Sequence, residues 1–494
     1  MRKRYILSLD EGTTSARALL YDTESRKIIT IAQQEFKQIY PTPGWVEHDA
    51  QEIWRAQLTS MQQVVSYADV DADEIYGIGI TNQRETVVMW DAKTGKPVHN
   101  AICWQCRRTT DFCEELKKTH LDFIRERTGL VIDAYFSASK IRWLLDNVPE
   151  TKELLEQDRL RVGTIDTFLI WKLTEGEAFV TDSTNASRTM LYNVKTDDWD
   201  DELLKIFDIP REILPKVVPS SGVVGHTRLL GKEVPIAGIA GDQQAALFGQ
   251  ACFEVGMAKN TYGTGCFILM NIGDKFRLSE DNLVTTVAWN IGGKITYAYE
   301  GSIFNAGSSV QWLRDELLLI EKASDTERYA LRVPDTNGVY FIPAFTGLGA
   351  PYWDMNARGA VLGLTRGANK YHFVRAVLES MAYASYDVIH AMEKDAGKIK
   401  ILKVDGGASN NNFLMQFQSD IIGVQIARPE ITETTGLGAA YLAGLATGAY
   451  ESLEDVAKNV IVGKEFIPDM SREVAKEKLH GWHKAVKRSL DWNE

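Results

Sequence analysis

The sequence predicts an α/β protein built from two related halves. Short apolar runs typical of strands alternate with amphipathic stretches typical of helices along most of the chain. The chain has 494 residues, which is more than one domain usually holds. A weak internal repeat is also present, because the order strand, Gly-Thr turn, strand at residues 5–21 returns at residues 256–272.

The composition is that of a globular protein without an extended basic surface. Hydrophobic residues make up 45% and charged residues 25% of the chain, and 55 Lys and Arg against 67 Asp and Glu give a net charge of −12. Binders of nucleic acid or anionic membranes need clustered positive charge, so we expect neither partner. Asp10 and Glu11 interrupt the first apolar run too early for a signal peptide, and no run reaches about 18 apolar residues, the minimum for a membrane span. We therefore expect a cytoplasmic protein with no integral membrane segment.

Three of the five cysteines lie close together in the sequence, at Cys103, Cys106 and Cys113. The C-x-x-C spacing, with His99 nearby, is compatible with a redox or zinc site. A structural zinc site usually adds a second pair of close ligands, which this cluster lacks. We favour buried thiols packed beside Trp104.

The first half begins with the strand, turn, strand unit. Residues 5–9 and 17–21 are expected to form strands around a turn at residues 10–15. Residues 49–67 have the periodicity of a helix, with Asp49 as N-cap and Glu52 completing a capping box. Residues 75–80 are expected to form a short buried strand, which leads directly into the polar residues 81–85.

Two later strands resemble the first in how they end. Residues 235–240 lead into Asp242 and a helix, and residues 401–404 lead into Asp405 and another helix. Asp10, at the end of the first strand, has the same position beside glycine. In open α/β folds ligands bind at the carboxyl ends of strands, so these three acids mark a candidate site.

The two halves are expected to meet near residue 250, which gives domains at 1–250 and 251–494. Each domain then contains one of the two Gly-Thr turns. The sequence contains no long low-complexity linker, so we expect the halves to contact each other extensively and to enclose a cleft.

Several nucleotide-binding motifs are absent. No Gly-Lys pair completes a Walker A motif, no Gly-x-Gly completes G-x-G-x-x-G, and the protein-kinase motifs do not occur. The Gly-Thr turns at residues 10–15 and 262–266 remain as candidates, because their backbone N–H groups and hydroxyls could bind phosphate oxygens. Asp10 could hold Mg²⁺ directly or through water. Ordinary hairpin turns use the same residue types, so the turns alone leave both interpretations open.

Seven segments of the chain match known motifs in order and at suitable separations: residues 9–17, 81–86, 104–107, 241–244, 262–265, 343–353 and 405–407. On these segments the chain resembles the FGGY carbohydrate kinases, the glycerol kinases in particular, which share the actin and Hsp70 ATPase fold. The resemblance runs from Tyr5 to about Ala449. It implies two ribonuclease H-like domains with a catalytic cleft between them. It also implies phosphorylation of glycerol to sn-glycerol 3-phosphate by ATP and Mg²⁺, in glycerol catabolism.

The resemblance also implies residue roles on the substrate side. Glycerol would contact Arg84, Glu85, Tyr135, Asp242 and Gln243, and its carbon backbone would lie against Trp104 and Phe267. A carboxylate beside a guanidinium suits a hydroxyl, which both donates and accepts hydrogen bonds. Without the resemblance, Arg84 and Glu85 would be taken as a solvated strand end and Tyr135 as a packing residue.

Asp242 is the residue that the resemblance implies as catalytic base. It would accept a proton as a terminal hydroxyl of glycerol attacks the γ-phosphate, and together with Asp10 it would bind the metal. A helix N-cap is the alternative interpretation of Asp242, and both roles can coexist.

The nucleotide contacts implied by the resemblance fall in both halves. Gln311 is equally compatible with an exposed place on a helix. At Gly407 a base or ribose could approach the backbone closely because no Cβ intervenes. The complete set is Thr13, Thr14, Ser15, Arg17, Thr264, Gly307, Gln311, Gly407 and Asn411.

Two other functions remain as alternatives. One is a kinase of the same family that acts on another small polyol or sugar. The other is a non-catalytic ATP switch of the actin and Hsp70 type, although such a chaperone would need a peptide-binding region beyond the two halves. The resemblance further implies a homodimer or homotetramer.

Overall fold

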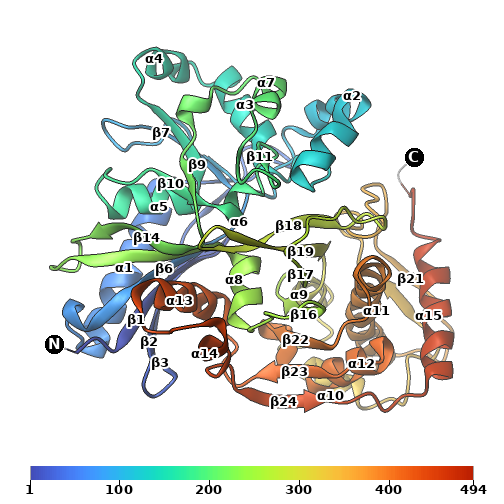
Figure 1. The fold of residues 1–494 in the computed structure, drawn as a ribbon. Helices are drawn as coiled ribbons and strands as arrows, with labels where there is room; N and C mark the ends of the chain where they lie inside the picture. Colours follow the sequence, from blue (N-terminus) through green and yellow to red (C-terminus); the bar gives the residue numbers. More distant parts are fainter. Residues whose placement is uncertain (1, 493–494) are drawn as a thin grey trace.

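The computed structural model describes residues 2–492, and its centre is one 13-stranded sheet. In Figure 1 this sheet runs from the N-terminal strands on the left to β24 at the bottom, near the middle of the view. The predicted α/β class is confirmed. From one edge to the other the strands are β24 (Val462–Phe466), β23 (Ile426–Pro429), β22 (Ile401–Asp405), β16 (Met257–Tyr262), β17 (Cys266–Gly273), β19 (Lys294–Ile303), β18 (Val284–Ile291), β14 (Ser221–Thr227), β15 (Val234–Gly241), β6 (Ile75–Asn82), β1 (Tyr5–Glu11), β2 (Ser15–Asp22) and β3 (Lys27–Glu35).

The predicted hairpin of each half is an antiparallel pair in the sheet, β1 with β2 in the first half and β16 with β17 in the second. Strand β1 also runs parallel to β6, and β6 runs parallel to β15, with Glu11 opposite Asn82 and Asn82 opposite Gly241. In the second half β16 runs parallel to β22, with Thr261 opposite Asp405. Both predicted strand, turn, strand units are present, and the parallel strands beside them end together.

Helices α8 (Asp242–Gly249) and α13 (Thr434–Thr447) lie side by side under the middle of the sheet (Figure 1). Helix α13 comes late in the chain, yet it packs against β1, β6 and β15 of the first half. The two helices approach closely because α13 is rich in small residues. A Cβ on Gly438 would lie 1.8 Å from the carbonyl oxygen of Ala245, so only glycine allows this contact. This packing fixes α8, which carries Asp242 at its first position.

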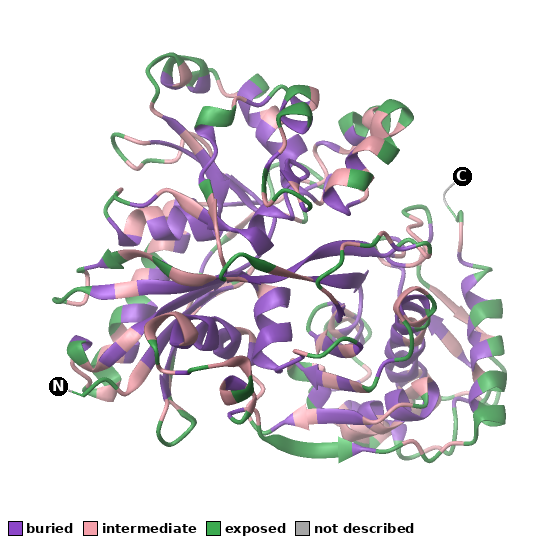
Figure 2. Ribbon diagram, in the orientation of Figure 1, coloured by how far each residue is buried: buried purple, intermediate pink, exposed green. Residues whose placement is uncertain are grey.

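The outer elements surround this centre. Helix α1 (Ala50–Ala68) packs against β2 and β3, and helix α11 (Lys370–Ala396) packs against α12 (Asn412–Ile422). Figure 2 shows that the central strands and α13 are mostly buried, whereas the outer helices expose one face. A 5-stranded sheet has the order β4 (Gln38–Ile39), β5 (Glu47–His48), β8 (Ala101–Ile102), β7 (Val87–Asp91), β9 (Leu160–Thr164). The other elements are η1 (Ala72–Glu74), α2 (Thr110–Thr128), α3 (Ser137–Asn147), α4 (Glu150–Glu156), α5 (Ile165–Leu173), β10 (Val180–Asp182), α6 (Ser183–Ala186), β11 (Tyr192–Asn193), β12 (Asp198–Trp199), α7 (Asp201–Phe207), η2 (Arg211–Ile213), β13 (Lys216–Val218), α9 (Gly307–Asp315), α10 (Asp325–Ala330), β20 (Tyr340–Ile342), β21 (Ala360–Leu362), η3 (Gly407–Asn410), α14 (Leu453–Ala457) and α15 (Arg472–Val486).

The start of helix α1 differs from the prediction in one detail. Asp49 is the N-cap, and its side chain accepts a hydrogen bond from the backbone N–H of Gln51 at 2.8 Å. The predicted capping box is wrong, because Glu52 Oε1 accepts instead from the backbone N–H of Lys37 at 3.3 Å. Glu52 therefore ties α1 to the segment after β3.

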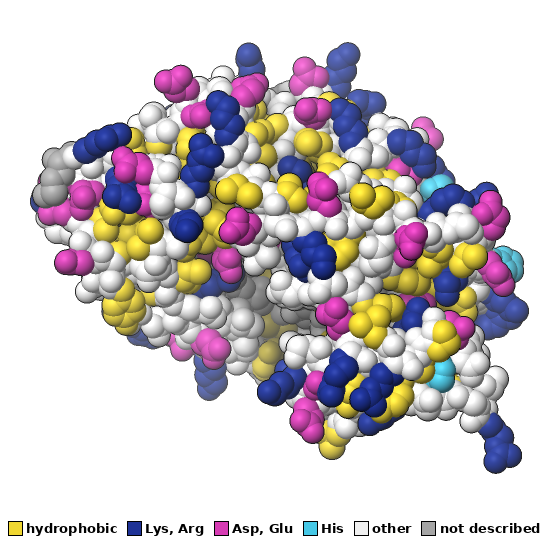
Figure 3. All heavy atoms as spheres, turned by 90° about the horizontal axis from the view of Figure 1, so that it is seen from below, with side chains coloured by type: hydrophobic (Ala, Val, Ile, Leu, Met, Phe, Trp, Pro, Cys, Tyr) yellow, Lys and Arg dark blue, Asp and Glu magenta, His cyan; other side chains and the backbone are white. Residues whose placement is uncertain are grey.

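The cysteines are packed as free thiols and the surface charges are mixed, as expected from the sequence. All five cysteines are buried and free, as packed thiols should be. Figure 3 shows positive and negative side chains interspersed over the face seen from below, which is hollowed near its middle. Among residues 2–492, none of the helices is both long enough and apolar enough to span a membrane.

Candidate active site

A cavity of about 730 Å³ lies between segments from both halves of the chain. Its walls include the turns of both hairpins, the residues that follow β6 and β8, the start of α8, and the loop at residues 343–358. Many of the predicted site residues line this one cavity: Thr13, Thr14, Arg84, Glu85, Trp104, Tyr135, Asp242, Thr264 and Phe267.

Asp242 faces the cavity from the first position of α8. Its Oδ1 lies 3.0 Å from Arg84 Nε and accepts from the backbone N–H of Gln243 at 2.8 Å. The Asp242 side chain is 31% exposed, so its carboxylate can reach a molecule in the cavity. The alternative interpretation of Asp242 as N-cap is wrong, because Gly241 occupies that position and the helix has no side-chain cap there.

A buried glutamate holds Arg84 in place. Arg84 Nη1 and Nη2 donate to the two carboxylate oxygens of Glu300 at 2.6 and 3.0 Å, which is a bidentate pair. Burial alone would raise the pKa of Glu300, but Arg188 and Arg84 outweigh it and lower this pKa to about 2. Glu300 is therefore ionised at neutral pH. It lies on β19, so the second half of the chain orients an arginine of the first half.

Glu85 is held in a strained conformation beside Arg84. Its φ is 61°, in the left-handed region that a non-glycine residue occupies at a cost of about 1–3 kcal/mol. Its Oε1 accepts from Arg188 Nε at 2.6 Å, and Arg188 Nη2 in turn lies 3.1 Å from Glu300 Oε1. Glu300 and Arg188 were not predicted from the sequence. A usable signal for Glu300 was a lone acid within the apolar strand that became β19.

Aromatic side chains form another part of the cavity wall. The rings of Trp104 and Tyr135 meet edge to face with centroids 5.6 Å apart, and Trp104 meets Phe267 in the same way at 6.4 Å. Trp104 Nε1 donates to Thr13 Oγ1 at 3.0 Å, and Arg84 Nη2 lies 3.4 Å from the Tyr135 hydroxyl. The apolar wall is thereby linked to both the first hairpin turn and the charged side of the cavity.

The first hairpin also carries an ion pair. Arg17 Nη2 donates to Asp10 Oδ2 at 2.7 Å across the β1–β2 pair. Ser15 Oγ accepts from Gln33 Nε2 at 3.1 Å, so its hydroxyl still has a proton to donate. Asp10, Ser15 and Arg17 lie next to the cavity-lining turn, but they are not part of the lining itself.

The carboxylates at this end of the sheet fit Mg²⁺. Burial raises the pKa of Asp10, Arg17 opposes the rise, and the nearby charge of Asp242 adds to it. A divalent cation beside these acids would remove the electrostatic penalty. In the part of the chain that the structure describes, no three His, Cys, Asp or Glu side chains gather into a metal site. Mg²⁺ commonly binds through one or two carboxylates plus substrate phosphates. Asp10 and Asp242 could provide the carboxylates.

The other residues implied for the nucleotide lie outside the cavity lining. Gly307 starts α9, and a Cβ there would lie 2.4 Å from the Gly263 carbonyl oxygen, so packing already requires this glycine. Gln311 is exposed on α9, the alternative that the sequence left open. Asn411 accepts from the backbone N–H of Leu414 at 2.9 Å as the N-cap of α12. Gly407 is exposed, with open space where a Cβ would be, so it could accept a close ligand.

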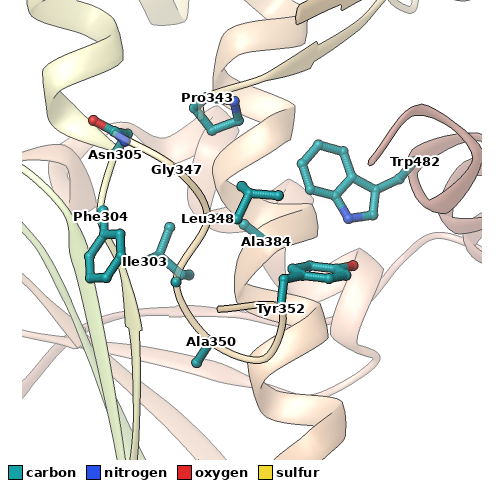
Figure 4. Close-up of a pocket in the computed structure, with 11 residues that line it drawn as sticks. Ile303, Phe304, Asn305, Pro343, Gly347, Leu348, Ala350, Tyr352, Ala384 and Trp482 are labelled. Carbon is teal, nitrogen blue, oxygen red and sulfur yellow. The ribbon is translucent and has the colours of Figure 1, made fainter. Parts of the chain in front are cut away.

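Loop 343–358 contributes further cavity residues that the sequence analysis did not assign. Phe345, Thr346, Trp353, Met355 and Arg358 line the cavity. Figure 4 shows the base of this loop, where Tyr352 and Leu348 lie near Ala384 of α11 and Trp482 of α15 around a small void of about 20 Å³. The Tyr352 hydroxyl and Trp482 Nε1 both donate to Asp387 Oδ2, at 2.8 and 2.7 Å. The loop is therefore anchored to the two long helices of the second half.

Fold and site together define an enzyme of the sugar- and polyol-kinase class, with a cavity lined by charged and aromatic side chains beside two Gly-Thr turns. The models of the FGGY family of carbohydrate kinases match the chain, the N-terminal domain at residues 5–249 and the C-terminal domain at residues 258–447. The chain belongs to this family.

Several individual proteins are similar to the chain over nearly its full length. The chain is 57% identical to glycerol kinase 1 of Clostridium tetani, over 99% of both chains. The crystal structure of Plasmodium falciparum glycerol kinase with ADP superposes with a TM-score of 0.91 at 38% identity, covering 99% of each chain. A ligand-bound xylulose kinase from Lactobacillus acidophilus gives a TM-score of 0.86 at 24% identity, covering 98% of this chain and 96% of that one, a likeness of fold alone.

Proposed function

We propose that this protein phosphorylates glycerol to sn-glycerol 3-phosphate with ATP. The observation that carries the proposal is the cavity itself. In it the carboxylate of Asp242 and the guanidinium of Arg84 face an aromatic wall, and the turns of both hairpins open into the same space. The full-length likeness to glycerol kinases supports glycerol as the substrate.

The proposed glycerol site suits a small triol. Each hydroxyl of glycerol can donate to a carboxylate and accept from a guanidinium or phenol, which Asp242, Arg84 and Tyr135 offer. Trp104 and Phe267 cover the carbon backbone and exclude water. An analogue lacking a hydroxyl would leave one of these buried polar groups unpaired, which is costly.

Asp242 is proposed as the general base. Among Asp242, Glu85 and Glu300, it is the acid whose carboxylate is substantially exposed to the cavity. Glu85 is ion-paired with Arg188, and Glu300 is ion-paired with Arg84. Arg84 Nε fixes one oxygen of the Asp242 carboxylate at 3.0 Å. Mg²⁺, held by Asp10 and Asp242 together with phosphate oxygens, would supply charge neutralisation on the nucleotide.

We propose that domains 1–250 and 251–494 share the nucleotide between them. Thr13, Thr14, Ser15 and Arg17 of the first domain would bind phosphate oxygens opposite Thr264 of the second. Gly307, Gln311, Gly407 and Asn411 would lie along the nucleoside. They are outside the cavity in this structure, so the proposal requires the nucleotide to extend from the cavity toward α9 and α12. Closure of the domains would exclude water and suppress ATP hydrolysis.

The two alternatives are tested by one experiment. The protein is incubated with MgATP and a panel of polyols and sugars, and ADP release is measured together with product identity. Glycerol should be the best substrate, with sn-glycerol 3-phosphate formed in equal amount to ADP. Faster turnover of another polyol would replace glycerol in the proposal, and ATPase activity without a phosphorylated product would favour the ATP switch. A homodimer or homotetramer, tested by light scattering, and a cytoplasmic location, tested by fractionation, stay predictions.

A further inference from the structure

A lysine that the proposed mechanism does not use lies beneath the active site. Lys259 is on β16, and its side chain is fully buried. Its Nζ donates to Gln243 Oε1 at 2.5 Å, to Thr261 Oγ1 at 2.9 Å and to the carbonyl oxygen of Phe267 at 3.2 Å. All three donors of the ammonium are thereby used, and all three acceptors are neutral. A buried cation bound only by neutral acceptors is an expensive arrangement for packing alone.

The position of Lys259 argues against a role in stabilising helix α8. Gln243 is in the first turn of α8, and the amino end of a helix carries positive partial charge, so a cation there is unfavourable. Lys403 on β22 gives a direct contrast, because it pairs across the sheet with Lys259 but donates to the carbonyls of Gln250 and Ala251, just after the end of α8. A cation at that end stabilises the helix. Lys403 thus has a structural explanation that Lys259 lacks.

The bond from Lys259 fixes which way the Gln243 amide points. An ammonium can only donate, so the amide oxygen must face it. The amide nitrogen of Gln243 is then directed to the other side, where it donates to Asp242 Oδ2 at 3.1 Å. Arg84 holds the other oxygen, Oδ1, at 3.0 Å. The two oxygens of the Asp242 carboxylate are therefore fixed from opposite sides.

We propose that Lys259 is a positioning residue that orients the Asp242 carboxylate through Gln243. The proposal rests on the function proposed above, in which Asp242 is the base. Loss of the ammonium frees the Gln243 amide to rotate, and a rotated amide presents its oxygen to the carboxylate and repels it. The base then loses the orientation in which it meets the attacking hydroxyl.

The surrounding charges are compatible with a lysine that remains protonated. Burial lowers the pKa of Lys259 to about 8, while Asp405 of β22 and Asp242 of α8 act against that shift. Arg84 lowers and Glu300 raises the same pKa to a smaller extent. The ammonium form therefore predominates near pH 7.

A double-mutant cycle tests the relay. The variants are Lys259→Met, Gln243→Leu and the double variant, each of which keeps a similar side-chain volume. Lys259→Met should lower kcat by roughly 10- to 100-fold, as expected for the loss of a hydrogen bond to a charged group, with the KM for MgATP unchanged. Because both residues act in one chain, the double variant should be no slower than the slower single variant. Independent, multiplying losses in kcat would overturn the proposal.

Two further measurements control the result. Lys403→Met is the matched control, and it should lower the thermal unfolding midpoint while kcat stays near the wild-type value. If Lys259→Met does not fold, Gln243→Glu tests the same relay, because it replaces the amide donor that faces Asp242 by an oxygen; unchanged kcat in this variant would count against the proposal. A crystal structure of Lys259→Met should show Gln243 turned away from Asp242, a readout that is independent of turnover. A wild-type protein that forms no glycerol phosphate would instead refute the proposed function.

Discussion

The two hairpins share one fold but carry opposite charges. In the first, Asp10 stands just before the turn and pairs with Arg17 at 2.7 Å. In the second, Thr261 has the place just before the turn, and the buried cation Lys259 lies two residues earlier on the same strand. Both turns open into the same cavity. Under the proposed function the two hairpins have different tasks: Asp10 of the first would help to hold Mg²⁺, and Lys259 of the second would orient the base Asp242.

Asp242 lies between the two hairpins, so its removal should have the largest effect. We expect Asp242→Asn to lower kcat by about 10² to 10⁴, the range typical of general-base catalysis, without unfolding the protein. Circular dichroism and a coupled ADP assay measure the two quantities. Asp49→Asn is the matched control, because asparagine caps a helix as well as aspartate does, and its activity should be unchanged. Near-normal turnover of Asp242→Asn would remove Asp242 as the base.

Asp10, the acid of the first hairpin, should affect the Mg²⁺ requirement more than the KM for glycerol. Asp10→Asn is expected to raise the Mg²⁺ concentration for half-maximal rate by about tenfold or more, since a hydrogen bond or contact to a charged group is worth roughly 1.5–3 kcal/mol. The KM for glycerol should change little. Rate measurements over a Mg²⁺ series at fixed ATP decide this. An unchanged Mg²⁺ requirement would show that Asp10 serves only its pair with Arg17.

Thr13 and Thr264, one in each hairpin turn, should differ in their effect on the KM for glycerol. Thr13→Val and Thr264→Val should each raise the KM for ATP by about 3- to 10-fold, the cost of one ordinary hydrogen bond. Thr13 Oγ1 also accepts from Trp104 Nε1, so Thr13→Val should raise the KM for glycerol as well. Thr264→Val should leave the KM for glycerol unchanged. Equal effects of both variants on glycerol would show that the hairpins do not differ in this way.

Acid should loosen the first hairpin before the second. Burial lowers the pKa of His48 from its usual 6.5 to about 4. Its ring is linked through Gln38 to the Thr13 carbonyl, at 2.8 and 2.9 Å. Because the folded-state pKa lies below the unfolded one, this stability is present above pH 6.5 and is lost as the pH falls toward 4. The loss is at most about 3 kcal/mol at 1.36 kcal/mol per pKa unit.

Denaturant unfolding at pH 7 and pH 5 checks the His48 prediction. The free energy of unfolding should fall less between these two values in His48→Gln than in the wild-type protein. The second hairpin is held by backbone bonds from Ala306 and Gly307 to Thr264 and Gly263, which do not titrate. Identical slopes in the two proteins would exclude His48 as a source of acid sensitivity.

Local sequence patterns were sufficient for the α/β class and the two hairpins. Strands such as β1 and β15 are apolar runs that lead into Asp10-Glu11-Gly12 and Gly241-Asp242, so they could be located without the structure. The Glu52 capping box failed because Glu52 bonds to the segment after β3, a tertiary contact that no spacing reports.

Only part of the site could be predicted from the sequence, because tertiary contacts hold the rest of it. Asp242 and the turn threonines lie in recognisable motifs, but Glu300 and Arg188 act through contacts between segments far apart in the chain. Glu300 and Arg84 are separated by 216 positions, for example. Lys259 acts through a contact with a helix residue 16 positions earlier, which no local motif indicates. A lone acid within a largely apolar run is the sequence signal for Glu300, whereas Lys259 is followed by the polar Asn260 and Thr261 and has no such signal.

The most direct test follows phosphate transfer itself. Wild-type protein is mixed with MgATP and glycerol, and ³¹P NMR follows the products over time. We expect sn-glycerol 3-phosphate and ADP to appear in equal amounts, and Asp242→Asn to form both far more slowly. Inorganic phosphate in place of glycerol phosphate, or equal rates in the two proteins, would contradict phosphorylation of glycerol at this cavity.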